Sequence, residues 1–125
     1  MKRELDENKP IFLQIKEQIE DLIMDGSLKI GERAPSTNEI AKFFQINPAT
    51  AGKGINELVL EGILVKKRGV GMFVTEEAPK IVTKKRKQTF YENYFLPMKK
   101  EAQKLEMHHQ ELINMLKWED EENEN

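Results

Sequence analysis

Two helix-start signals lie close together in this chain and constrain its fold more than any other feature. The segment Pro35-Ser36-Thr37-Asn38-Glu39 has the pattern of a capping box, in which Ser36 and Glu39 each satisfy a backbone amide of the other. Asn47-Pro48 is a second signal, because Asn caps helices well and Pro suits the first helical position, where no amide donor is needed. The sequence therefore predicts a short helix, a very short turn and a further helix.

Helices are expected on both sides of that turn and also before it. Apolar residues recur at steps of three and four from Pro10 to Gly26, which predicts an amphipathic helix at about residues 11–25. The second start signal opens a helix at about residues 48–61. In the connector between the first two helices, Leu28 and Ile30 are expected to pack on the core.

A β-hairpin should follow the third helix. Residues 63–65 and 72–74 are apolar and predict two strands, joined by a glycine-containing basic turn at residues 66–71. A supporting helix, two helices joined by a tight turn, and a basic hairpin follow one another in a winged helix-turn-helix. We therefore expect a mainly α fold with a small β-hairpin.

The outer face of the helix at residues 48–61 carries small and polar side chains, so it can enter a DNA major groove, which is about 12 Å wide. Lys67 and Arg68 at the hairpin turn can reach phosphates or a narrow minor groove. Gly54 should mark close packing between helices. Gly52 is expected to face outward, where it either lets the backbone approach DNA or has no role.

Composition narrows the classes of function. The 125 residues suit one domain with an appendage; they include 20 basic and 22 acidic side chains and no cysteine. Residues 26–75 nevertheless hold seven basic and four acidic residues, so an anionic partner would meet this middle segment. Neither a signal peptide nor a membrane span is evident, which favours the cytoplasm and no membrane partner.

The sequence motifs do not indicate an enzyme or a metal-binding site. No catalytic triad order, phosphate-cradling loop or dinucleotide fingerprint is present. His108 and His109 are adjacent, so on a helix they point in different directions and cannot share a metal as an i, i+4 pair can. We expect no enzyme, no cofactor and no metal site.

The run from Pro10 to Val74 also resembles a known family in many spaced residues. The matching segments are Pro10-Ile11-Phe12-Leu13-Gln14-Ile15, Gly26-Ser27-Leu28-Lys29-Ile30-Gly31-Glu32, Pro35-Ser36, Ala41, Asn47-Pro48-Ala49-Thr50, Glu61-Gly62-Ile63-Leu64 and Gly69-Val70-Gly71-Met72-Phe73-Val74. This run resembles the DNA-binding domain of the GntR superfamily of bacterial transcription regulators. The short remainder resembles the YtrA-type subfamily, whose C-terminal helices dimerise.

The resemblance and the helix pattern together define candidate DNA contacts. Ser36 and Thr37 match positions that contact phosphate, and the family reads the major groove from the helix that carries Thr50 and Lys53. The candidate DNA-binding residues are Ser36, Thr37, Asn38, Asn47, Ala49, Thr50, Lys53, Lys67, Arg68 and Gly69.

Two positions depart from the family pattern. Ala34 stands where the family usually has Leu, and Asn38 stands where it usually has Arg. Asn38 can donate a neutral hydrogen bond but cannot bind guanine or phosphate as a bidentate cation.

The C-terminal region has the pattern of an interface. Apolar residues recur at alternating steps of four and three from Tyr91 to Leu116, a heptad seam that His109 interrupts. Together with neighbouring aromatic residues, this patch is too large for one surface helix to expose. A second copy of the chain is the favoured cover, and this chain's own winged domain is the alternative. The candidate dimerisation residues are Phe90, Tyr91, Tyr94, Phe95, Met98, Ala102, Leu105, Leu112 and Leu116.

Pro97 should kink this helical region or mark a boundary, since it lacks a backbone donor. A continuous heptad favours one long helix, whereas the resemblance implies a break near Glu106-Met107-His108, which we adopt. The expected organisation is a winged helix-turn-helix at residues 1–79, a helical dimerisation region at 80–118 and a disordered acidic tail at 119–125.

These patterns predict a sequence-specific DNA-binding transcriptional regulator. The resemblance further implies a homodimeric repressor that binds a palindromic operator, often in its own operon. The alternative is a winged-helix module that binds proteins without specific DNA binding. The expected partners are double-stranded DNA and a second copy of the chain, and the existence of a small-molecule effector stays open.

Overall fold

The computed structural model describes residues 1–123 and divides the chain into two compact units, Met1–Lys85 and Arg86–Asn125. The division falls inside helix α4 (Ala78–Phe90). Across the described residues, no helix is both long and apolar enough to cross a membrane.

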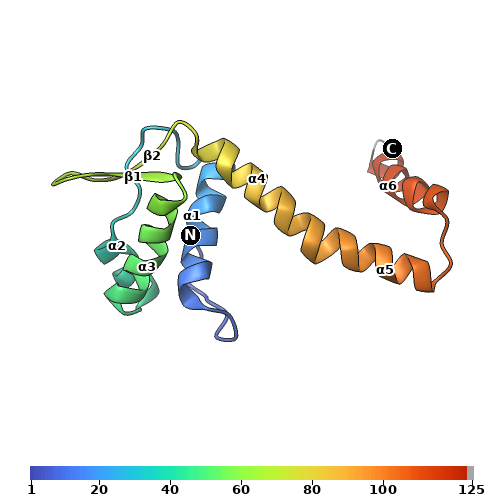
Figure 1. Ribbon diagram of the computed structural model, residues 1–125, viewed down its shortest axis with the longest axis horizontal. Helices are drawn as coiled ribbons and strands as arrows, with labels where there is room; N and C mark the ends of the chain where they lie inside the picture. The colour runs from blue at the N-terminus through green and yellow to red at the C-terminus, as the bar shows by residue number, and fades with distance from the viewer. Residues whose placement is uncertain (124–125) are drawn as a thin grey trace. The chain divides into compact units, whose positions relative to one another are not determined.

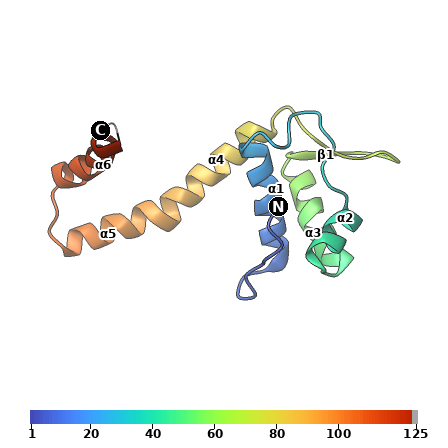
Figure 2. The same ribbon diagram turned by 180° about the vertical axis from the view of Figure 1, so that it is seen from behind.

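The first unit is a three-helix core with a two-stranded hairpin (Figures 1 and 2). Helices α1 (Ile11–Met24), α2 (Thr37–Phe44) and α3 (Pro48–Leu60) are followed by strands β1 (Leu64–Lys67) and β2 (Gly71–Val74). The strands are antiparallel, with register from Leu64 opposite Val74 to Lys67 opposite Gly71. The mainly helical fold with a small β-hairpin, predicted from the sequence, is confirmed.

Both predicted start signals cap their helices. Ser36 Oγ accepts from the backbone N–H of Glu39 at 3.1 Å, and the Glu39 carboxylate accepts from the Ser36 N–H at 3.4 Å, which completes the capping box. Asn47 Oδ1 accepts from the Ala49 N–H at 2.8 Å at the start of α3. Between the helices, Gln45 adopts a left-handed conformation (φ +55°), so the chain reverses within a very short turn.

The core of the first unit lies where α1 packs against α3. Ile15, Ile19, Ile55 and Leu58 are fully buried there. A Cβ built on Gly54 would lie 3.0 Å from the backbone oxygen of Phe12 and 3.3 Å from Ile15 Cγ2. The prediction that Gly54 marks close helix packing is confirmed, because no side chain fits between the two backbones.

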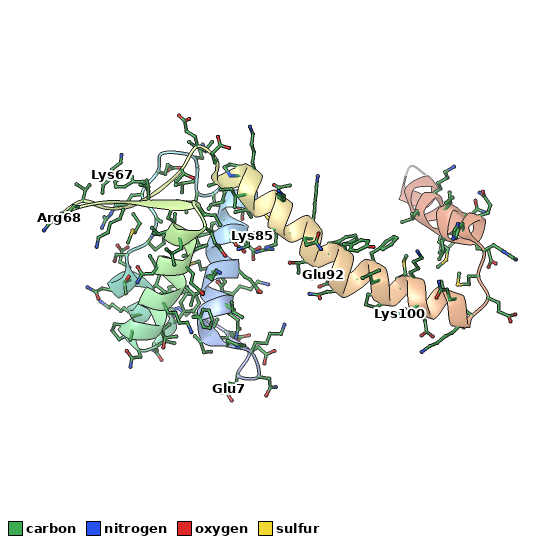
Figure 3. The ribbon with its side chains drawn as sticks, in the orientation of Figure 1. Glu7, Lys67, Arg68, Lys85, Glu92 and Lys100 are labelled. Atoms are coloured by element: carbon green, nitrogen blue, oxygen red, sulfur yellow. The ribbon has the colours of Figure 1, made fainter. Side chains whose placement is uncertain are left out.

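A network of charged residues, which includes the Lys85 labelled in Figure 3, joins α1, α3 and α4 beside this core. Lys16 lies 2.9 Å from Glu61 and 3.6 Å from Glu57, and Lys85 lies 2.6 Å from Glu20 and 2.9 Å from Glu61. Burial alone would raise the pKa of Glu61, but hydrogen bonds from Lys16 and Lys85 outweigh it and hold that pKa below the ordinary value. The network therefore keeps Glu61 ionised and ties the start of α4 to the other helices.

The structure corrects four local expectations in the first unit. Ile30 is 51% exposed and does not pack on the core, whereas Leu28 is buried as expected. Lys66 and Lys67 belong to β1, so the turn is shorter than expected. Gly52 does not face outward: a Cβ there would meet the Thr37 methyl group at 3.7 Å, because the tight turn brings α2 against α3.

The fourth difference concerns the end of the winged unit. We expected the winged helix-turn-helix to end at residue 79, but Pro79 lies in the first turn of α4, where its missing amide has no helical partner to lose. Ala78 and Val82 are fully buried in the same core as α1 and α3. The winged unit therefore includes the first two turns of α4.

The second unit comprises the end of α4, a π-helical turn η1 (Tyr91–Phe95), α5 (Leu96–Lys104) and α6 (His109–Asn123). The π turn directly precedes Pro97, and the Leu96 N–H donates to Tyr91 O, five residues back. Pro97 thus marks a helix boundary, as predicted.

The expected break between two C-terminal helices is confirmed. Glu106 has a left-handed φ of +55°, its N–H donates to Gln103 O at 3.1 Å, and the Met107 N–H donates to Ala102 O at 3.0 Å. This pair of bonds is a Schellman motif, which ends α5 without the usual glycine.

The acidic tail differs in part from expectation. Helix α6 continues to Asn123 and so includes part of the segment expected to be disordered, in keeping with the good helix propensity of glutamate. The rest of that segment, residues 124–125, lies outside the described residues.

Two glycines of α3 form a matched pair that tests the packing of this helix. Replacing either glycine with alanine should stabilise the helix by about 1 kcal/mol, because alanine has the higher helix propensity. In Gly54→Ala the new methyl group is forced against the Phe12 carbonyl, and overpacking of about 1–3 kcal/mol should outweigh that gain. In Gly52→Ala the methyl group makes only ordinary contact with Thr37. Urea unfolding should therefore show Gly54→Ala less stable and Gly52→Ala more stable than the parent; equal stabilisation by both would contradict the close packing.

Candidate nucleic-acid interface

The N-terminus of α2 presents the first group of predicted DNA-binding residues. Ser36 and Thr37 are half-buried and Asn38 is exposed. The Ser36 hydroxyl oxygen already accepts the Glu39 amide in the capping box, so the hydroxyl hydrogen remains for donation to an external acceptor. This end of α2 also carries the positive end of the helix dipole, which favours an anion such as phosphate.

Helix α3 presents a second group on its outer face. Asn47, Ala49 and Lys53 are exposed and Thr50 is half-buried. Asn47 is the N-cap, so its side-chain oxygen is occupied by the helix itself and only its amide N–H₂ can donate outward. None of these side chains is bulky near the start of α3, which leaves the helix free to approach a flat or grooved partner.

Lys53 has a contact that the sequence did not predict. Its ammonium nitrogen lies 3.9 Å from the centroid of the Phe12 ring of α1, a cation–π contact. Such a contact at an exposed site contributes about 0.5–1 kcal/mol. Lys53 is thus held along the edge between α1 and α3 by a contact that costs little to break.

The hairpin carries the third group at its outer end (Figure 3). Lys67 is the last residue of β1, and Arg68 and Gly69 form the turn; all three are exposed. The Lys67 ammonium lies 4.4 Å from the centroid of the Phe73 ring. Arg68 therefore extends from the tip, whereas Lys67 lies along the wing face.

The structure brings the groups on α2 and α3 together, because these two helices pack at the tight turn. The residues at the hairpin tip form a separate position on the same unit. Sequence reasoning did not include Arg33, which precedes α2 and bridges to β2. Its position depends on pairing between residues far apart in the sequence, which no local pattern reveals.

The predicted dimerisation residues form an apolar groove in the second unit. The groove has a volume of about 800 Å³ and is lined by eight of the nine predicted residues; the ninth, Tyr91, stacks on Phe95 with ring centroids 5.3 Å apart. Glu101, Met107 and Met115 also line it and were not predicted. Tyr94 is 67% exposed and Leu105 62% exposed, so the described residues of the second unit leave this face largely uncovered.

Comparison with known proteins decides the family. The family described as "Bacterial regulatory proteins, gntR family" matches residues 12–74, about half of the chain. This chain belongs to the GntR family. The match covers α1, α2, α3 and the hairpin, which are the elements that carry the candidate DNA-binding residues, and it confirms the resemblance inferred from the sequence.

Individual relatives extend this result. The GntR chain is 39% identical over 69 residues to the HTH-type transcriptional repressor YtrA of Bacillus subtilis (strain 168), covering 55% of this chain and 53% of that repressor. The matched region is thus about half the length of that relative. The family is one of transcriptional regulators rather than enzymes, in agreement with the sequence prediction.

Solved structures resemble this GntR chain in fold. A GntR family transcriptional regulator from Listeria monocytogenes aligns with a TM-score of 0.76 and 27% identity, over 90% of this chain and 97% of that chain. The DNA-binding domain of AraR, solved in complex with operator ORX1, aligns with a TM-score of 0.52 and 32% identity, over 60% of this chain and 92% of that chain.

Two cationic residues of the interface should have separable effects on DNA binding. We expect Lys53→Ala, on the outer face of α3, to reduce discrimination between a specific site and random DNA, since it removes a side chain placed to reach base edges. Arg68→Ala, at the hairpin tip, should weaken binding to both DNAs by a similar factor. Titration of each variant with both duplexes checks this. Unchanged binding by both variants would refute the assignment of these residues.

Proposed function

We propose that this chain is a cytoplasmic homodimeric repressor that binds a palindromic operator, in its own operon, through two winged units. Each α3 enters a major groove, the N-terminus of α2 contacts phosphates, and the hairpin tip contacts the adjacent backbone or minor groove. The observation that carries the proposal is that the starts of α2 and α3, whose polar side chains are exposed or half-buried, pack side by side within the family's matched region.

The charge distribution supports DNA as the partner of the first unit. The formal net charge of the chain is −2, yet Lys53, Lys67 and Arg68 are exposed on α3 and the hairpin. The acidic residues Glu57, near the end of α3, and Glu61, which directly follows α3, are engaged by Lys16 and Lys85. The cations at the candidate interface therefore remain available to phosphates.

The apolar groove of the second unit supports a second copy as its cover. An exposed apolar face of this size marks an interaction surface in most proteins. An isologous pair of copies would bury the same face twice, which suits the heptad spacing of its residues. Two winged units would then be held together, and their recognition helices would meet half-sites about one helical turn or a multiple of it apart.

A single variant that disrupts the groove tests both dimerisation and the contribution of the dimer to operator affinity. Phe95→Glu combined with Leu105→Glu places two charges in the groove and should leave a winged unit that sediments as a monomer. Operator affinity should fall by about 10²-fold or more, because the second half-site contact is no longer intramolecular.

Lys100→Glu provides the control for this experiment. Lys100 is exposed on α5 outside the groove, and its reversal changes the net charge by the same amount as the double substitution (Figure 3). This control should sediment as a dimer. If the double variant also remains a dimer, the interface lies elsewhere.

A further inference from the structure

The segment before α2, residues 31–34, forms backbone hydrogen bonds with the edge of β2 that does not pair with β1. The Gly31 N–H donates to Val74 O at 2.9 Å, the Val74 N–H donates to Glu32 O at 3.0 Å, and the Ala34 N–H donates to Met72 O at 2.8 Å. Arg33 consequently lies opposite Phe73 in an antiparallel bridge. From there the chain runs directly into α2 (Figure 1), so this position connects the wing with the helix-turn-helix.

The alternation of side chains along the strands places Arg33 on the outer face of the wing. Val74 and Leu64 face the core, so Phe73 and Gly71 face away from it, and Lys67 pairs with Gly71 on this outer face. Arg33 shares the face of its partner Phe73. Lys67 lies over the Phe73 ring on this face, and Arg33 projects from the backbone position opposite Phe73.

Gly71 makes room for the Arg33 side chain. A Cβ built on Gly71 would lie 2.7 Å from Arg33 Nε, 3.5 Å from Cδ and 3.6 Å from Cγ. Gly71 also has a φ of +142°, which side-chain-bearing residues rarely adopt. The Arg33 side chain thus lies across bare backbone, in a defined path along the wing.

The guanidinium group of Arg33 is only loosely paired. Its nearest acid among the described ion pairs is Glu39, with Nη2 to Oε1 at 3.8 Å, and both side chains are more than half exposed. That distance is too long for a hydrogen bond, and the same Glu39 oxygen accepts from the Ser36 amide. More than half of the Arg33 side chain is therefore open to solvent, and its ion pair with Glu39 is a long one.

We propose that Arg33 binds a DNA backbone phosphate that lies between the phosphates met by the α2 N-terminus and by the hairpin. This inference rests on the proposed DNA-binding function. A phosphate suits the position better than a base, because Arg33 lies outside the exposed face of α3 that enters the groove. The planar guanidinium binds phosphate in a bidentate manner, and the phosphate replaces the weak contact with Glu39.

The test compares three variants of the full chain on two duplexes of equal length. One duplex carries the site that the parent protein selects from a random pool, and the other has random sequence. Arg33→Met keeps an aliphatic side chain over Gly71 and removes the charge. Arg33→Lys keeps the charge and removes the planar guanidinium group. Lys80→Ala, at an exposed position of α4, is the charge-matched control for Arg33→Met. Thermal unfolding of each variant verifies that the fold is retained.

Binding constants are measured against sodium chloride concentration. For Arg33→Met we expect the slope of log Kobs against log salt to become shallower by about 1.8, the value for two phosphates, because each winged unit of the dimer contributes one Arg33. The affinity should fall about tenfold on both duplexes. Arg33→Lys should retain the slope and lose several-fold in affinity. Lys80→Ala should match the parent protein.

Two outcomes would overturn the proposal. An unchanged salt slope in Arg33→Met means that Arg33 neutralises no phosphate, and a loss confined to the selected duplex means that it contacts a base. Failure of the proposed function gives a different signature, since the parent protein itself would then bind both duplexes equally. In that event the slope on random DNA still decides the role of Arg33.

Discussion

The contact between α1 and α3 at Gly54 is the constraint on which the rest of the first unit depends. Because no side chain separates the two helices there, α3 lies close to α1 and turns Ala51, Ile55 and Leu58 into the core. The opposite face of α3 must then be exposed. The small and polar residues at the start of α3 are thus available to a partner as a consequence of burial on the other side, and the capped turn before Pro48 places α2 beside them.

The charged side chains of the first unit also differ between its buried junction and its exposed face. Lys16 and Lys85 are engaged by the carboxylates of Glu20, Glu57 and Glu61, at the junction of α1, α3 and α4. The cations of the opposite side have weaker partners: Lys53 and Lys67 rest on aromatic rings, and Arg33 has one long ion pair. Cation–π contacts and long ion pairs cost little free energy to break, so these cationic side chains can exchange them for contacts with phosphates. An acidic chain can in this way present a basic surface.

Local signals in the sequence predicted much of this fold. The capping box at Ser36 and the Asn47 cap follow from nearest-neighbour chemistry, and the close packing at Gly54 follows from its position on the apolar face of α3; each is confirmed. Features that depend on distant pairing were missed. Arg33 lies beside Phe73 only because the segment before α2 pairs with β2, and Ala78 and Val82 are buried only because α4 packs on the three-helix core. The candidate site was predictable where it lies on helix starts and at the hairpin turn, and not along the wing face, where tertiary pairing places the side chains.

We propose that two winged units, joined through their C-terminal helices, recognise one palindromic DNA site. The most direct measurement is nuclease protection of the DNA upstream of this chain's own gene, with excess random DNA as competitor and salt as the second variable. We expect one protected region with two-fold symmetric half-sites that persists in the presence of competitor. Binding that competitor removes completely, with no protected site at any salt concentration, would contradict it.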